Sequence, residues 1–200
     1  MNIAIYIYDD AEVLDFSGPF EVFSTAKRIA RNNWNIFLVA ETDSLVKARG
    51  NFLVSPHYTI ENHPDIDVLV VVGGIHTQEV KKAHVIAWIS KVAVSAQRVV
   101  SVCTGAFLLA EAGLLKGLSA TTHWEDIPDL MSAYPELRVL DNQRWVSEGK
   151  FVTSGGISAG IDMSLYLVAQ LSPGELAQRT ARQMEYDWRS CPEQTVQADS

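Results

Sequence analysis

The sequence has few cysteines and few basic residues, and it has no long hydrophobic run. Two cysteines in 200 residues are too few for a disulfide framework. An excess of acidic over basic side chains gives a formal net charge of −8, which argues against a nucleic-acid partner. Apolar runs such as DVLVVVGG are far shorter than the ~20 residues that span a bilayer. We therefore predict no nucleic-acid partner and no membrane association, and we expect a cytoplasmic location.

Spacings typical of metal and cofactor sites are also missing. None of the five histidines stands in an H-E-x-x-H pattern. The segment GGISAG does not match the dinucleotide-binding fingerprint, because its glycines are misplaced and it follows a late strand. The first residues, MNIAIYIYDD, lack the basic region of a leader and predict a strand. The sequence thus predicts neither a metal nor a cofactor.

Short apolar runs alternate with longer amphipathic stretches along the chain. This alternation predicts an α/β fold in which helices cover both faces of a mostly parallel sheet. Small hairpins are expected around Gly50 and near Gly149. The length fits a single domain, 1–200, with an irregular tail over 187–200. The predicted strands are 2–8, 35–41, 67–73, 98–103 and 151–156, and the predicted helices are 19–31, 78–96, 104–115, 158–171 and 173–186.

One of the two cysteines, Cys103, stands where a predicted strand meets a predicted helix. The small residues after it suit a sharp turn, as in the nucleophile elbow of hydrolases. A helix N-terminus favours the thiolate, so we expect a thiol pKa below the ~8.5 of free cysteine. The alternative is a small buried hydrophobic residue, which many free cysteines are. Cys191 lies in the polar tail and has no such setting.

Other candidate residues follow other strands, and ligands bind at this edge of α/β sheets. The backbone amides of Gly74 and Thr104 could form an oxyanion hole, or the Gly-Gly pair could be a plain tight turn. Asp15 lies among apolar residues and before a Ser-Gly-Pro helix entry. It could act as an acid or base with a raised pKa, or it could cap the helix. His123, in TTHW, could bond the thiol or the substrate, although a lone histidine is more often structural.

Five segments occur in an order that is similar to the DJ-1/PfpI superfamily: VLDFSGPFEVF, VVVGG, SVCTGAFLLAEAGLLKGLSATTHW, VTSGGISAGIDMSL and AQRTARQMEY. The resemblance implies a flavodoxin-like three-layer α/β/α sandwich, related to class I glutamine amidotransferase domains. It also implies a homodimer. Within the superfamily, the LDFSGP, SVCTG and TTHW segments look most like isonitrile hydratases, which hydrate an isonitrile to an N-substituted formamide without a metal.

By this resemblance, Cys103 would be the nucleophile, Asp15 the acid and base, and Thr104 the elbow residue that orients the site. Gly74, Ile75, Ile157 and His123 would surround a small-molecule substrate, and the positions of Phe16, Ile75 and Ile157 suggest an apolar lining. PfpI-type peptidases carry a histidine directly after the cysteine, which this chain lacks, so peptidase activity is not expected. A glyoxalase-like enzyme and a redox-stress or ligand-sensing protein stay open as alternatives. The CTG…TTHW…SAGID pattern also occurs in sensor domains of AraC-type regulators.

Overall fold

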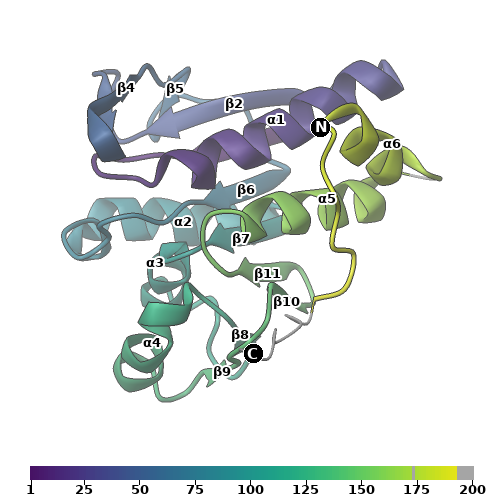
Figure 1. Ribbon diagram of the computed structural model, residues 1–200. Coiled ribbons are helices and arrows are strands. Elements are labelled where there is room, and N and C mark those ends of the chain that lie inside the picture. Colours follow the sequence, from purple (N-terminus) through teal and green to yellow (C-terminus); the bar gives the residue numbers. More distant parts are fainter. Residues whose placement is uncertain (173, 193–200) are drawn as a thin grey trace.

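A central seven-stranded sheet organises the molecule, for which a computed structural model describes residues 1–172 and 174–192 (Figure 1). All of its strands pair in parallel except β10, which pairs antiparallel with β11. The predicted mostly parallel sheet is therefore confirmed. In spatial order the strands are β10 (Trp145–Glu148), β11 (Phe151–Ser154), β7 (Arg98–Val102), β6 (Val68–Val71), β1 (Asn2–Tyr6), β2 (Asn35–Ala40) and β5 (Tyr58–Thr59).

Two groups of helices lie on opposite faces of this sheet, which gives the three layers of the predicted sandwich (Figure 1). Helices of one group contact one another: α1 (Val13–Ala30), α5 (Ala159–Leu171) and α6 (Leu176–Gln183). The other group is α2 (Ala83–Ser95) and α3 (Gly105–Glu111). Strands β1 and β6 are almost wholly buried, because apolar side chains on both of their faces are covered. No helix among the described residues is long and apolar enough to cross a membrane.

Smaller elements lie around the sheet. Strands β3 (Val46–Ala48) and β4 (Phe52–Val54) form the hairpin expected around Gly50. The predicted turn near Gly149 is the β10–β11 connection. Strands β8 (Ser119–Ala120) and β9 (Arg138–Val139) pair in parallel on either side of α4 (Ile127–Ala133). Short 3₁₀ turns cover Arg49–Asn51, Glu79–Lys81 and Trp124–Asp126.

Several predicted helix ends were wrong. The first helix starts at Val13 and not at residue 19, so Pro19 lies inside it. The predicted helix 78–96 begins as a 3₁₀ turn, and extended backbone at Lys82 delays α2 to Ala83. Helix α3 ends at Glu111, shortly before Gly113, whose φ of 72° is left-handed.

The C-terminal part of the chain has a shorter last helix than predicted. The helix expected over 173–186 is Leu176–Gln183, and Pro173 lies outside the described residues. Residues 187–192 form no helix or strand, and 193–200, the rest of the expected tail, are also outside the described residues.

Candidate active site

Cys103 follows β7 directly and occupies a sharp elbow before α3. Its φ of 55° is left-handed, which is uncommon for a residue other than glycine. Its backbone amide donates to the Ser154 carbonyl at 3.1 Å, so the elbow is tied to the end of β11. A Cβ atom at Gly105 would lie 2.2 Å from the Val71 carbonyl oxygen, so only glycine lets α3 begin this close to β6. The predicted strand–turn–helix setting of the thiol is therefore present.

Asp15 reaches the same place from the first turn of α1 and is completely buried. Its Oδ2 accepts a hydrogen bond from the Gly73 amide at 3.1 Å. Its Oδ1 accepts one from the Ile157 amide at 3.0 Å. The carboxyl group therefore joins the loops after β6 and β11 to α1. It does not cap the helix, because the N-cap residue is Glu12 and Asp15 lies inside.

Burial raises the pKa of the Asp15 carboxyl to about 7, although the Ile157 and Gly73 amides and the Cys103 thiol lower it. The nearby Glu12 raises it further. A carboxyl group that titrates near neutrality can donate a proton and later accept one. The predicted raised pKa of Asp15 thus has a physical basis in its burial.

The expectation of a depressed pKa for Cys103 was wrong. Burial raises the pKa of the thiol, and the Asp15 carboxylate raises it further. The Thr104 amide hydrogen-bonds the thiol and lowers its pKa, but burial outweighs this effect. The thiol and the carboxyl therefore titrate as a coupled pair, in which a charge on one disfavours a charge on the other.

The predicted oxyanion role of Gly74 does not match the hydrogen bonds. Its amide donates to Thr104 Oγ1 at 2.9 Å, and Thr104 Oγ1 donates back to the Gly74 carbonyl at 2.9 Å. This reciprocal pair holds the loop after β6 against the elbow, which agrees with an orienting role for Thr104. A Cβ at Gly73 would lie 2.6 Å from the Cβ of Cys103, so glycine is required for this contact. The Thr104 amide is left as the donor beside the sulfur.

The loop after β11 contributes residues to the site, and only some of their roles were predicted. Ile157, which was predicted to line the substrate, lines the cavity beside the elbow, and its backbone amide also holds Asp15. A Cβ at Gly156 would lie 3.2 Å from Cys103 Sγ and 2.4 Å from His123 Cδ2, so this glycine is next to both. Thr122 Oγ1 donates to the Cys103 carbonyl at 2.8 Å. The GG and TT pairs in the sequence were the signals for these residues.

His123 lies beside the elbow, on the wall of a cavity of about 380 Å³. Its Nδ1 is 3.4 Å from Asp126 Oδ2. Of the three residues expected to form an apolar lining, Ile157 lines this cavity, whereas Phe16 and Ile75 do not, and Ile75 is 47% exposed. Most of the lining is polar or glycine: Thr121, Thr122, His123, Trp124, Ile127, Asp141, Asn142, Gln143, Arg144, Gly155, Gly156, Ile157, Ser158 and Ala159.

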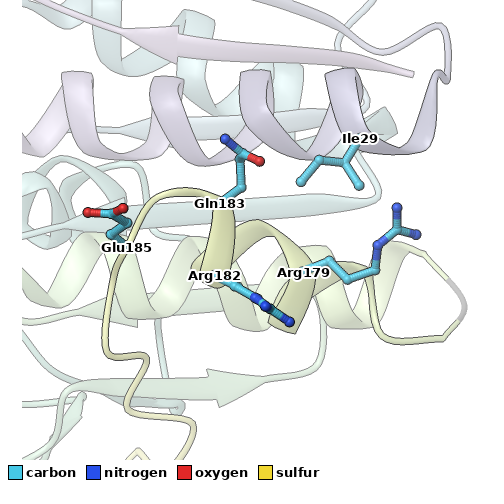
Figure 2. Close-up of a pocket in the computed structure, with 5 residues that line it drawn as sticks. All are labelled: Ile29, Arg179, Arg182, Gln183 and Glu185. Carbon is cyan, nitrogen blue, oxygen red and sulfur yellow. The ribbon is translucent and has the colours of Figure 1, made fainter.

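Two further hollows lie on the α1 side of the molecule. One, of about 430 Å³, is lined by Ile29 of α1 and by residues of and after α6 (Figure 2). Gln183 points from α6 toward α1, whereas Arg182 projects away from it (Figure 2). The other is an apolar groove of about 450 Å³ lined by Leu14, Phe16, Ser17, Gly18, Phe20, Glu21, Leu38, Ile161 and Met184. Among the described residues, no group of three or more His, Cys, Asp or Glu side chains could hold a metal ion.

Comparisons with known proteins show to which family this chain belongs. The DJ-1/PfpI family model matches residues 1–170. Isonitrile hydratase from Pseudomonas putida is 33% identical over 187 residues, which are 93% of this chain and 78% of that protein. The transcriptional regulator GbdR from Pseudomonas aeruginosa is 24% identical, and this chain spans about half (51%) of its length. A THiJ/PfpI family protein from Pseudomonas syringae superposes with a TM-score of 0.84 at 28% identity, covering 100% of this chain and 78% of that one. The chain belongs to the DJ-1/PfpI family.

Proposed function

We propose that the protein is an isonitrile hydratase-like enzyme that converts an isonitrile to an N-substituted formamide. The observation that carries this proposal is the buried Asp15 carboxyl, with a pKa of about 7, next to the Cys103 thiol at a strand–helix elbow. This pair supplies a nucleophile and a proton carrier in one water-poor site. The similarity to the Pseudomonas putida isonitrile hydratase supports the same chemistry.

In the first step the thiol adds across the terminal carbon of the isonitrile. The raised pKa of Cys103 means that the resting thiol keeps its proton, so a bond from sulfur to carbon forms as that proton leaves. Asp15 takes the thiol proton and delivers it to the same carbon. The product is a thioimidate, R–N=CH–S–Cys103, and Asp15 is again a carboxylate.

In the second step water adds to the thioimidate. The Asp15 carboxylate accepts a proton from water as the oxygen attacks the carbon. Asp15 passes this proton to the nitrogen, the carbon–sulfur bond breaks, and the formamide leaves while the hydroxyl proton of the adduct returns to the sulfur. The two steps add one water in total, and the covalent intermediate divides one difficult reaction into two easier ones.

A ligand-sensing role is the second candidate. Two relatives, GbdR and CdhR from Pseudomonas aeruginosa, are transcriptional regulators. The cavity beside Cys103, which has both polar and apolar lining residues, could bind a small molecule without turnover. A glyoxalase-like reaction of Asp15, Cys103 and His123 is the third candidate, since His123 lies next to the elbow.

The test is a panel of isonitriles and α-oxoaldehydes assayed in the presence of a metal chelator. Formamide produced from an isonitrile, and lost in Cys103→Ala, supports the proposed enzyme. Lactate produced from methylglyoxal without any formamide supports the glyoxalase. If neither product forms and Cys103 is oxidised to sulfinate on peroxide treatment, the sensor reading replaces both. Cys191→Ser is the matched control and should keep the activity, because the Cys191 thiol is exposed and far from the elbow in sequence.

A further inference from the structure

A buried ion pair lies next to the loop that holds Asp15. Arg144, which precedes β10, donates from Nε to Asp162 Oδ2 on α5 at 2.5 Å, and its Nη2 contacts the same oxygen. The side chain of Asp162 is fully buried, and that of Arg144 is 9% exposed. Desolvation offsets much of the attraction in such pairs, so a buried ion pair is weak evidence for added stability. Its geometry favours a role in orientation.

The C-terminal segment closes over this pair. The Arg189 amide donates to the second oxygen of Asp162 at 3.0 Å, and Trp188 Nε1 donates to the Asp162 carbonyl at 3.3 Å. The Arg144 amide donates to the Pro192 carbonyl at 2.5 Å. In Figure 1 this segment, drawn in yellow, runs from α6 past α5 to β10. Both members of the ion pair are thus anchored to it.

Arg144 also touches both ends of the loop after β11. Its carbonyl accepts from the Gly155 amide at 2.9 Å, and its Nη2 lies 3.5 Å from Ser158 Oγ. Between these contacts stands Ile157, with a φ of 55°. A β-branched residue in left-handed backbone is strained and persists only when its surroundings fix it. The Ile157 amide that this conformation presents is the one bonded to Asp15.

We propose that Arg144 and Asp162 are positioning residues, which fix segment 155–158 so that the Ile157 amide stays on the Asp15 carboxylate. The inference rests on the proposed function only in that Asp15 is taken as the proton carrier of the reaction. Asp162 does not line the cavity beside the elbow, whereas Arg144 does, and neither residue forms or breaks a bond of the substrate in this scheme. Their effect reaches the chemistry through one hydrogen bond to Asp15.

Loss of this hydrogen bond should change the pKa of Asp15 in a known direction. The Ile157 amide stabilises the charged form of Asp15, so a loosened loop raises the pKa of that carboxyl. The other titratable groups that act on Asp15 are Glu12, Cys103 and Tyr8, and none of them is part of the ion pair. Asp162 itself faces Arg144 and the Tyr186 side chain.

The experiment measures alkylation of Cys103 by iodoacetamide between pH 5 and 10 in a Cys191→Ser background, so that only one thiol reacts. The rate should rise with pH, level off where Asp15 ionises, and rise again, because the two groups are coupled. We expect Asp162→Asn to move this plateau to a pH about one unit higher. A hydrogen bond to a charged group changes the pKa of that group by about this amount. Arg144→Lys keeps the positive charge but removes the planar guanidinium group that contacts Asp162 through two nitrogens, so it should move the plateau by less.

A matched control breaks an ion pair elsewhere. Glu41→Gln removes the contacts of Glu41 with Lys82 and His84, and we expect the plateau to stay where it is. If Asp162→Asn does not fold, Trp188→Phe removes only the donor to the Asp162 carbonyl, and a smaller upward shift is expected. A folded variant with lowered stability and an unshifted plateau would overturn the positioning role. Absence of isonitrile turnover in the unmodified protein would count against the proposed function alone, since alkylation needs no substrate.

Discussion

Asp15 and Cys103 form a pair in which only one negative charge is easily accommodated. Both side chains are buried, and each raises the pKa of its partner when it is ionised. Such a pair keeps a proton available at neutral pH and releases it when the substrate carbon becomes the better acceptor. The raised pKa of the Cys103 thiol disfavours the thiolate in the resting site, whereas the expected low pKa would have favoured it.

The first prediction concerns this coupling. Asp15→Asn removes the charge that opposes the thiolate, so the pKa of the Cys103 thiol should fall. Isonitrile turnover should nevertheless drop by ~10²–10⁴-fold, because an amide carries no proton to carbon. Thiolate absorbance near 240 nm, titrated in a Cys191→Ser background, gives the pKa. A thiol pKa that rises, or turnover that stays near its original rate, would refute the assigned roles.

The second prediction concerns stability. The pKa of Asp15 rises from 3.8 in a model peptide to about 7 in the folded protein, so the folded state binds this proton more tightly than the unfolded chain. The stabilisation is therefore full below about pH 4 and is lost as the pH rises through about 7, by up to about 4 kcal/mol. Urea unfolding of the protein and of Asp15→Asn at pH 5 and pH 8 measures this difference. The unmodified protein should lose stability relative to the variant between these pH values, and equal losses would contradict the buried-acid assignment.

At the site, the side chains that carry the chemistry could be predicted from the sequence, but the backbone amides that hold them could not. Cys103 and Asp15 were predictable because an isolated cysteine at an elbow and an acid among phenylalanines are unusual in themselves. The Gly73 and Ile157 amides were not, since every residue except proline has such a donor and only tertiary structure aims it. Burial, which reverses the expected shift of the thiol pKa, likewise depends on three-dimensional packing.

At the scale of elements, the start of α3 lies very close to the end of β6. Gly105→Ala would place a Cβ 2.2 Å from the Val71 carbonyl oxygen, which is rigid backbone. We expect a loss of about 1–3 kcal/mol or more, as for overpacked cores. Gly113→Ala is the matched control, because no atom lies within 4 Å there and only its φ of 72° is unfavourable, which costs about 1–2 kcal/mol. Urea unfolding compares the two. If Gly113→Ala proved the more damaging, the tight α3–β6 contact would not be a constraint on the fold.

Strands and helices were predicted well where apolar periodicity is strong. The end of a helix was predicted poorly where the prediction rested on a single proline. The buried strands β1, β6 and β7 were recognised from their β-branched runs. Pro19 was read as a helix start, yet α1 extends six residues before it, where Asp15 is held by amides from two other loops. Those contacts come from distant parts of the chain, so no local pattern contains them.

At the scale of the whole molecule, we propose a homodimer, which the resemblance to the DJ-1/PfpI family implies. The apolar groove on α1 is the surface we assign to a second copy, because apolar side chains dominate its lining and Leu14 at its edge is 36% exposed. Sedimentation equilibrium at micromolar concentration should give twice the 22.1 kDa of one chain. Phe20→Glu places a charge in the groove and should shift the mass toward the monomer. Val94→Glu on α2, where the side chain is already 83% exposed, should leave the mass unchanged. A single 22.1 kDa species for the unmodified protein would rule out the homodimer, and a dimer that persists in a folded Phe20→Glu variant would place the interface elsewhere.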